Sequence, residues 1–407
     1  MRGLSLIEIL IALAIGVMLV LGLVEVFGAS RTAYQLSTGL ARVQENGRFA
    51  LDFLQRDMRL AGHLGCVNDQ ARFLPENMTG TRLALASTFN DPATPGDFGS
   101  VNHAALRFDA GMRGYEAAGS DGATALALAT VPTVATVAEA WAPAIEAQIF
   151  SRMVRPVVGS DVIALRFFSA PGAQMLAFDP GATPVSVTVA PTQTATLADG
   201  VAEPGLFGVS DCMNAAVFQA TGFDTTSGVM TVAATGLNRD TLTGNEAFVP
   251  GQANVFRAES IVFYVGVNPA GNPALYRLRF TAPPGAATLS AVNEELVEGV
   301  ESLQLRYGQD NEIDPANRPT GNIGVSRVAN ELLPAGNADT AWRRVGAVQV
   351  GLVMRSAERA AASQRDTGQA DVRPLSVLGV RVDAPADTYY RSVYEDHIAL
   401  RNRLFGN

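Results

Sequence analysis

The sequence of 407 residues predicts an α+β fold, in which a long N-terminal helix packs on a large, antiparallel, β-rich head. Two observations predict this fold. An apolar run near the N-terminus continues without a break into a segment with helical periodicity. From residue 62 onward, short apolar stretches alternate with turns rich in Gly, Pro and Thr, which is typical of strands.

The apolar run is long enough to cross a membrane. From Leu4 to Val24 there are 21 residues, which as a helix span about 31 Å and match a hydrocarbon core of roughly 30 Å. Arg2 precedes the run, so the positive-inside rule places the N-terminus in the cytoplasm and the rest of the chain outside. A cleaved secretory signal and a permanent anchor both compete for this segment. The secretory signal fits less well, because its apolar region is shorter and Glu8 interrupts the start of this one.

The helical pattern does not stop at the end of the apolar run. Apolar or small residues recur at steps of three and four and form one face. We therefore expect a single helix from about Leu4 to Leu60, roughly 85 Å long, with its second half packed on a soluble domain. The residues of this predicted face are Leu36, Leu40, Val43, Gly47, Ala50, Leu54 and Met58.

The head reads as a set of strands joined by turns. The segments 260–267 and 274–282 flank "NPAGNP" and predict a hairpin. The region 67–150 is Ala-rich and weakly periodic, with one possible strand (121–131) and one short helix (134–150). The sequence leaves open whether the head is one domain or two lobes. The other predicted strands are 160–168, 185–190, 228–235, 300–308, 345–356, 375–382 and 393–402.

The composition argues against several classes of function. A net charge of −9 argues against a nucleic-acid-binding surface, which needs a basic stripe. All 30 basic residues are Arg, so the chain has no P-loop lysine, no Schiff-base lysine and no Ser–Lys dyad. It also has no GxSxG, HExxH or GxGxxG motif. We therefore expect a protein that is not an enzyme and needs no cofactor.

Two cysteines, Cys66 and Cys212, are too few to build a zinc site, and neither belongs to a CxxC pair. If the head is exported to an oxidising compartment, a Cys66–Cys212 disulfide is the natural interpretation. Closing so long a loop would stabilise the fold by roughly 4 to 5 kcal/mol in the chain-entropy model. The alternative is a pair of free, buried thiols.

The acidic loop "DNEIDPANR" (310–318) offers Asp310 and Asp314 as weak candidates for metal ligands. It lacks the Gly at the sixth position and the distant bidentate Glu of a calcium loop. A solvated turn is the simpler interpretation, and we expect no metal.

The first residues of the chain carry a more specific signal. Gly3–Glu8, "GLSLIE", followed by the long apolar run, resembles the class III signal of type IV pilins. The resemblance implies that a prepilin peptidase cuts between Gly3 and Leu4 and methylates the new amine of Leu4. In that family Phe is commoner than Leu after the cleaved Gly. The leader, Met1–Gly3, is short, so the true start codon could lie upstream.

The resemblance also gives Glu8 a role. A charged side chain in hydrocarbon costs on the order of 3 kcal/mol, so it needs a partner. In the pilin family that partner is the N-terminal amine of the neighbouring subunit, here the amine of Leu4, and the pair sets the register of the filament. The alternative is a carboxylate that reaches the membrane surface and has no function.

Both ends of the chain resemble one family of minor pilins. The stretches "QENGRFALDFLQRDMRLAGHLGC" (44–66) and "YYRSVYEDHIALRNRL" (389–404) are similar to PilW-type minor pilins. The resemblance implies a type IV pilin-like fold with four parts. These are a leader peptide (1–3), a transmembrane or filament-core half of the helix (4–28), an amphipathic half (29–61) and the head (62–407).

The same resemblance implies a function. The protein would prime assembly of a type IV pilus and be incorporated near its tip, where a bulky head is easier to accommodate. It would support twitching motility, adhesion or DNA uptake. Its implied partners are other minor pilins, the major pilin, the prepilin peptidase and the inner-membrane assembly platform, with a tip adhesin as a further possibility. It would be held in the bacterial inner membrane by one span, with the head in the periplasm, before it enters the pilus.

Two alternatives remain at this point. A J-type pseudopilin of a type II secretion system shares the N-terminal signal. A membrane-anchored exported enzyme or binding module would not need Gly3 or Glu8, and an enzyme would predict a catalytic cluster that the sequence does not show.

Overall fold

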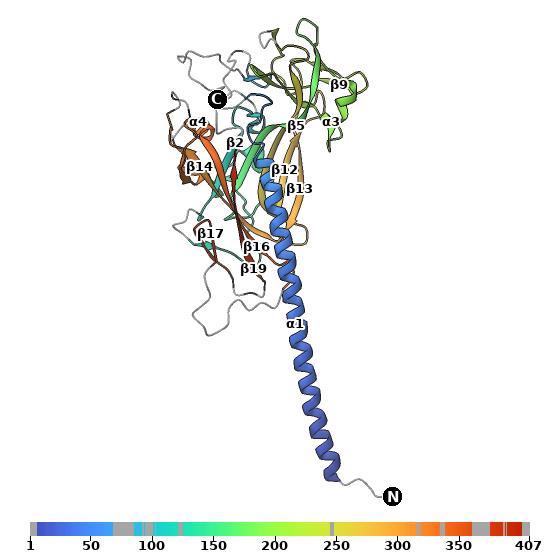
Figure 1. Cartoon of the computed structure of the whole chain (residues 1–407), viewed down its shortest axis with the longest axis vertical. Helices are drawn as coiled ribbons and strands as arrows, with labels where there is room; N and C mark the ends of the chain where they lie inside the picture. The colour runs from blue at the N-terminus through green and yellow to red at the C-terminus, as the bar shows by residue number, and fades with distance from the viewer. Residues whose placement is uncertain are drawn as a thin grey trace.

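The structure is a computed structural model. It describes residues 6–67, 85–91, 93, 101, 103–120, 125–244, 248–314, 317, 319–333, 338–359, 375–385, 387 and 389–400. A single long helix, α1, projects from a head made almost entirely of strands (Figure 1). This arrangement confirms the predicted α+β, pilin-like fold.

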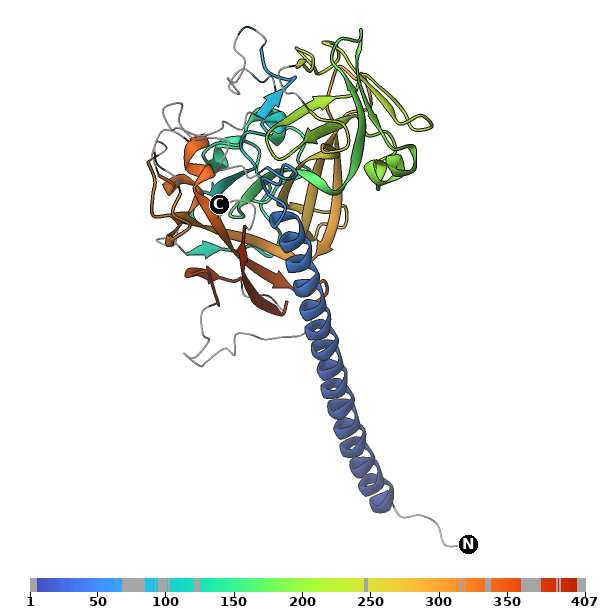
Figure 2. The same ribbon diagram turned by 45° about the horizontal axis from the view of Figure 1, so that its top comes forward.

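Helix α1 runs from Leu6 to Met58 without interruption. No proline lies within this range, and apolar or helix-favouring residues dominate it. Its N-terminal half extends away from the head (Figure 2). The packed face starts later than the sequence predicts, because Leu36 is 38% exposed and Leu40 is only half-buried. The buried residues of α1 are Val43, Gly47, Ala50, Leu54, Asp57 and Met58.

The largest sheet of the described chain has 12 strands. Its main path runs in the order β1-β8-β7-β11-β5-β6-β10-β9. Strand β12 extends it from β11 to β13, and β2 joins it to β4. The strands are β1 (Leu85–Ser87), β2 (Met112–Ala117), β4 (Trp141–Ala142), β5 (Val162–Asp179), β6 (Val185–Val189), β7 (Leu206–Ser210), β8 (Ala215–Gln219), β9 (Gly222–Asp224), β10 (Val229–Val232), β11 (Asn254–Val267), β12 (Pro273–Thr281) and β13 (Ser290–Glu298).

Two smaller sheets complete the β structure that is described. One has the order β15-β14-β16-β19, and the other has the order β17-β18-β3. Their strands are β3 (Leu126–Ala127), β14 (Val300–Asp310), β15 (Ile323–Arg327), β16 (Val345–Arg355), β17 (Leu375–Val377), β18 (Val380–Asp383) and β19 (Arg391–Ala399). The short helices are α2 (Ala147–Phe150), α3 (Thr194–Ala198) and α4 (Ala338–Arg343). The 3-10 turns are Ala104–Leu106, Ala138–Ala140, Pro191–Gln193 and Ala329–Glu331.

Most predicted strands are present, and the predicted hairpin is confirmed by the antiparallel β11–β12 ladder from Ser260–Phe280 to Val267–Pro273. The pairing is antiparallel throughout the described ladders except for β1 with β8 and β18 with β3. The single strand predicted at 375–382 is wrong. Leu378 and Gly379 both have positive φ, 47° and 85°, and turn the chain back on itself between β17 and β18.

The main core lies between the 12-stranded sheet, the four-stranded sheet and α1. It joins helix residues such as Leu54 to Phe263 of β11, Leu303 of β14 and Leu352 of β16. The opposite face of the large sheet holds a second cluster, which includes Tyr115.

Two neighbouring strands, β5 and β11, are joined by a long connection that folds on its own core. The strands pair from Ile163–Phe263 to Ser169–Arg257 and, after a register shift, at Ala173–Val255 and Gln174–Asn254. Residues 170–253, which include the last part of β5, are called the insertion below. It contributes all but one of the residues of a separate buried cluster, whose members lie between Ala173 and Val255. The insertion lies beyond the C-terminal end of α1, on the side away from the N-terminus (Figure 1).

Ser160 and Asp161 join the two main sheets. The Asp161 carboxylate accepts hydrogen bonds from the N–H of Ala117 on β2 and of Leu305 on β14, both at 2.8 Å. The Asp161 N–H donates to the Leu303 carbonyl at 2.8 Å, and the Ser160 hydroxyl accepts from the Leu303 N–H at 3.0 Å. Complete burial raises the pKa of Asp161 to about 7, although the two N–H groups act to lower it. Asp161 therefore forms the hydrogen bonds to β14 that a neighbouring strand would otherwise form at Leu303 and Leu305.

Candidate functional site

The N-terminal half of α1 exposes apolar side chains on all sides. Its most apolar window has a mean hydropathy of 2.8 and is 0% buried, and by length and composition it could cross a membrane. Glu8 lies exposed in the first turn, where the helix dipole favours an anion. The predicted cleavage residues, Gly3 and Leu4, lie outside the described residues.

A close contact between helix and strand fixes where α1 sits on the head. Gly47 of α1 faces the ring of Tyr394 on β19. A Cβ atom added at Gly47 would lie 2.7 Å from Cε2 of that ring, closer than real Cβ contacts. Only glycine fits this position without a shift of the ring or the helix. The contact joins the two stretches whose sequences resemble PilW-type pilins.

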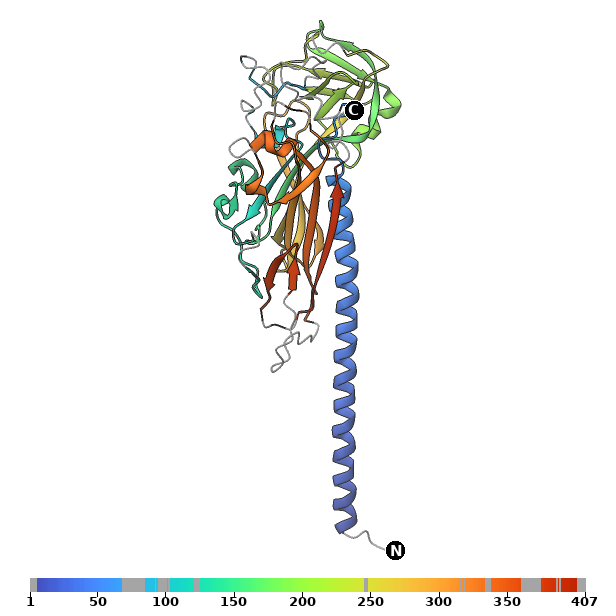
Figure 3. The same cartoon turned by 60° about the vertical axis from the view of Figure 1, so that its left-hand side comes forward.

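Side chains on both flanks of α1 make hydrogen bonds to the head. On one flank, the Asn46 amide donates to the Glu298 carbonyl of β13 at 3.1 Å. On the other flank, the Gln55 amide donates to the Asp396 carboxylate of β19. Figure 3 shows β19 running alongside the last turns of α1. The helix is therefore held between two strands that belong to different sheets.

The last turn of α1 is also held by an ion pair. The Asp57 carboxylate lies 2.9 Å from the Arg277 guanidinium of β12, which in turn lies 2.6 Å from Glu294 of β13. Burial raises the pKa of Asp57, and the charge and hydrogen bond of Arg277 only partly offset this effect. The Asp57–Arg277 ion pair fixes the orientation of the last turn of α1 on β12, because both side chains are largely removed from water.

A buried network of charges supports β19 behind this contact. Arg391 of β19 donates to Glu301 of β14, with Nε 2.7 Å from Oε2, and to Asp387 at 2.6 Å. Arg355 of β16 donates to the same Glu301 at 3.3 Å. Burial raises the pKa of Asp387, but the hydrogen bonds and charge of Arg391 outweigh it and hold that pKa below its ordinary value. The network fastens β19 in register, and so fixes the Tyr394 ring.

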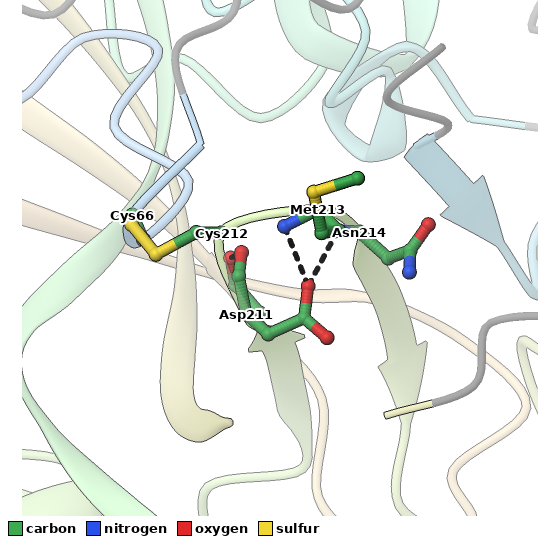
Figure 4. The surroundings of a disulfide bond; sticks show 6 residues. Cys66, Asp211, Cys212, Met213 and Asn214 are labelled. Atoms are coloured by element: carbon green, nitrogen blue, oxygen red, sulfur yellow. Dashed lines mark hydrogen bonds between the residues drawn. A yellow bond between two sulfur atoms is a disulfide. The ribbon is translucent and has the colours of Figure 1, made fainter. Parts of the chain in front are cut away.

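A disulfide links the chain that leaves α1 to the insertion. Cys66 and Cys212 are bonded, with their Cα atoms 4.8 Å apart. Cys212 lies in the turn between β7 and β8, and Figure 4 shows how Asp211 shapes that turn. One carboxylate oxygen of Asp211 accepts from the N–H groups of Met213 at 2.7 Å and Asn214 at 2.6 Å. In this structure neither cysteine is a free thiol.

The two candidate metal ligands serve the loop itself. The Asp310 carboxylate is buried and accepts from the N–H of Glu312, the N–H and hydroxyl of Thr320 and the N–H of Gly321. The Asp314 N–H donates to the Glu312 carboxylate at 2.9 Å. The donors to Asp310 occupy the lone pairs of its carboxylate that a cation would need. No cluster of three or more His, Cys, Asp or Glu that could hold a metal occurs within the described ranges.

Residues 262–402 match a family model, PilW, the type IV pilus-assembly protein W. The matched range begins within β11, includes all of β12 to β19 and contains Tyr394 and Arg391. No curated protein and no solved structure matches the chain significantly. The match supports a PilW-like family and a part in type IV pilus assembly. Such a family suggests a structural rather than an enzymatic role.

The sequence alone did not identify the residues of the head that contact and support α1. Gly47 was expected on the packed face, but its partner Tyr394 was not, because the two residues are far apart in the sequence. Arg391 and Glu301 were also missed. No local signal distinguishes them, because β14 ("VESLQLRYGQD") and β19 ("RSVYEDHIA") each carry several other polar residues.

Proposed function

We propose that the protein is a minor pilin, processed by a prepilin peptidase and incorporated near the tip of a type IV pilus. The observation that carries this proposal is the division of α1. Its N-terminal half is apolar and unburied, and its C-terminal half is fixed to the head by Gly47, Asp57 and their partners. Such a helix can lie in a membrane before assembly and among other helices afterwards, while the head keeps its fold.

Glu8 has a specific part in this proposal. It is an exposed acidic side chain in the first turn of a helix segment suited to hydrocarbon, where any charged group is costly. The amine created on Leu4 by cleavage would be mostly protonated at neutral pH. Pairing Glu8 with that amine of a neighbouring subunit would remove the cost and set the axial position of each subunit in the filament.

The position of the insertion supports a place near the tip. The insertion extends the head beyond the C-terminal end of α1, as the views in Figures 1 and 3 agree. A subunit repeated along a shaft has other subunits packed above it. The terminal subunit has none, so bulk at this end of the head is accommodated there without a clash.

The experiment that tests this proposal is mass spectrometry of the N-terminal peptide of the protein purified from its native membranes. We expect a chain that begins at N-methylated Leu4. A chain that begins near Ala29 would instead indicate an ordinary secretory signal, and an intact Met1 a simple anchor. Either of these results would overturn the proposal.

A deletion strain separates the pilus from the secretion alternative. We expect loss of surface pili and of twitching, with secretion of exported enzymes unchanged. The family match at residues 262–402 favours this outcome. A strain with normal pili and impaired secretion would assign the protein to a type II secretion system.

A further inference from the structure

A cavity of about 380 Å³ lies between the loop 200–203 of the insertion and strands β12 and β13, and the function proposed above does not use it. One wall is the loop 200–203 that follows α3. The other wall is formed by residues of β12 and β13, among them Arg279, Thr281, Ser290 and Glu294. Its volume falls in the range of small-molecule sites, roughly 300 to 1,000 Å³.

The loop that forms the first wall is held in place. Arg257 of β11 donates through Nη1 to the carbonyl oxygens of Leu197, Ala198 and Asp199, at 3.3, 3.0 and 2.6 Å. Its Nε donates to Glu259 at 2.6 Å, which fixes the guanidinium. These carbonyls belong to the C-terminal end of α3, where a cation is favoured. Arg257 of β11 therefore holds the chain just before the loop 200–203, and so fixes the position of this wall of the cavity.

Arg279, in the second wall, is a cation whose donors lack close partners. Its side chain is only 16% exposed, yet the guanidinium lies 3.7 Å from Glu259 and 3.9 Å from Glu294, beyond hydrogen-bond distance. Each of these carboxylates has a tighter partner, Arg257 at 2.6 Å and Arg277 at 2.6 Å. Within the described part of the chain, Arg279 donates no hydrogen bond, and its Nε is buried without an acceptor.

The remaining polar groups of the cavity can both donate and accept. The hydroxyls of Thr281 and Ser290 make no hydrogen bond to a described residue, and Glu203 lies exposed on the loop. With Arg279, Glu203 and Glu294, the lining carries one positive and two negative groups. A further anion is therefore disfavoured. A neutral ligand with neighbouring hydroxyls can accept from the guanidinium and donate to the carboxylates at the same time.

We propose that this cavity binds a neutral, hydroxyl-rich ligand, a saccharide unit, between the insertion and the β12–β13 edge of the large sheet. Arg279 would donate to its oxygen atoms and Glu203 would accept from its hydroxyls. The aliphatic side chains of Val201 and Val292, which also line the cavity, would pack against its C–H face. Binding at this end of the head would give the molecule a means of recognising a glycan-bearing surface.

The test is a titration of the purified full-length chain with neutral monosaccharides, followed by saturation-transfer NMR. The probes are glucose, galactose, mannose and N-acetylglucosamine, with glucuronic acid as the anionic comparison. The detergent is lauryldimethylamine oxide, because it has no sugar headgroup. We expect at least one neutral sugar to bind at millimolar concentration and glucuronic acid to bind more weakly. No neutral binding, or tighter binding of the acid, would overturn the proposal.

Variants locate the site. We expect Arg279→Leu to weaken binding by about tenfold or more, since it removes charged hydrogen-bond donors, and Glu203→Gln to weaken it by a smaller factor. Arg381→Leu is the matched control, because Arg381 is 66% exposed on β18 and does not line the cavity. If Arg279→Leu does not fold, Glu203→Gln and Ser290→Val decide the question. Unchanged binding in both would overturn the site. This test is separate from the pilin proposal, because it measures binding to the purified chain.

Discussion

The two halves of α1 form one continuous helix but have opposite relations to the rest of the chain. Between Leu6 and Phe27, every residue but Gly16 is exposed, and the exposed side chains are mostly large and apolar. Between Val43 and Met58, one face is completely buried against two sheets. The comparison shows that the head buries one face of the second half, whereas it leaves the first half exposed. Substitutions of the same type in the two halves should therefore have different effects.

The largest expected effect falls on assembly rather than folding. We expect Glu8→Ala to leave membrane insertion and the stability of the head unchanged and to reduce surface pili by at least tenfold, because the subunit loses its charge partner. Pili are counted by electron microscopy of shear fractions. Glu45→Ala, in the second half and also exposed, is the control and should assemble normally. Normal piliation by Glu8→Ala would remove this explanation of the carboxylate.

The second prediction compares one substitution at two positions. Leu54 is fully buried in the main core, so Leu54→Ala should lower the free energy of unfolding of the head by about 2 to 5 kcal/mol. Leu19 is 70% exposed, and Leu19→Ala should leave that free energy unchanged. Denaturant titration of both variants in the same detergent measures the difference. Equal effects would mean that the two halves are not energetically distinct.

Glycine gives a third comparison. At Gly47 an added methyl group meets the Tyr394 ring, so Gly47→Ala should cost about 1 to 3 kcal/mol of stability. Nothing lies within 4 Å of a Cβ added at Gly22. Gly22→Ala should therefore favour the helix by about 0.5 to 1 kcal/mol. Thermal unfolding of the head and helicity by circular dichroism report the two effects. A neutral Gly47→Ala variant would show that Tyr394 can move away.

The smallest expected effect is a dependence on pH. Burial raises the pKa of Asp57, so its ionisation is less favourable in the folded state. Its contribution to stability is therefore largest below the ordinary carboxyl pKa near 4 and is lost as the pH rises through the raised value. In the Asp57→Asn variant, the free energy of unfolding should therefore decrease less as the pH rises above about 4. Asp52→Asn, exposed on the same helix, should not change it. Denaturant midpoints across this range provide the measurement.

The sequence predicted the elements that local periodicity encodes. The helix was found because apolar residues recur every three or four positions, and β11, β12, β14 and β16 were found because their apolar residues are continuous or alternate. Strand β13 was missed because "SAVNEELVE" is acidic, as suits a strand that pairs with one strand, β12, within the described residues. The turn at Leu378–Gly379 was missed because Leu rarely adopts a positive φ.

The candidate site was predictable in part for the same reason. Glu8 belongs to a contiguous motif, so the sequence alone singles it out, but its role in assembly stays a prediction, as do the roles of Gly3 and Leu4. The contact of Gly47 with Tyr394 and the ion pair of Asp57 with Arg277 join residues that are hundreds of positions apart. Only the pairing of β19 with β16, and of β12 with β13, brings them together. Local patterns contain no information about such pairings.

The insertion has a consequence for how the head can change. Its two ends lie side by side on β5 and β11, where the ladder shifts register after Ser169–Arg257 and then pairs Ala173 with Val255 and Gln174 with Asn254. A chain of almost any length can join two such neighbouring points, since the entropy of closing a loop grows only slowly with its length. This junction is therefore a place where a different domain could be grafted onto the same anchor, with loss of the Cys66–Cys212 disulfide and of the β1–β8 pairing that tie the insertion to the rest of the chain.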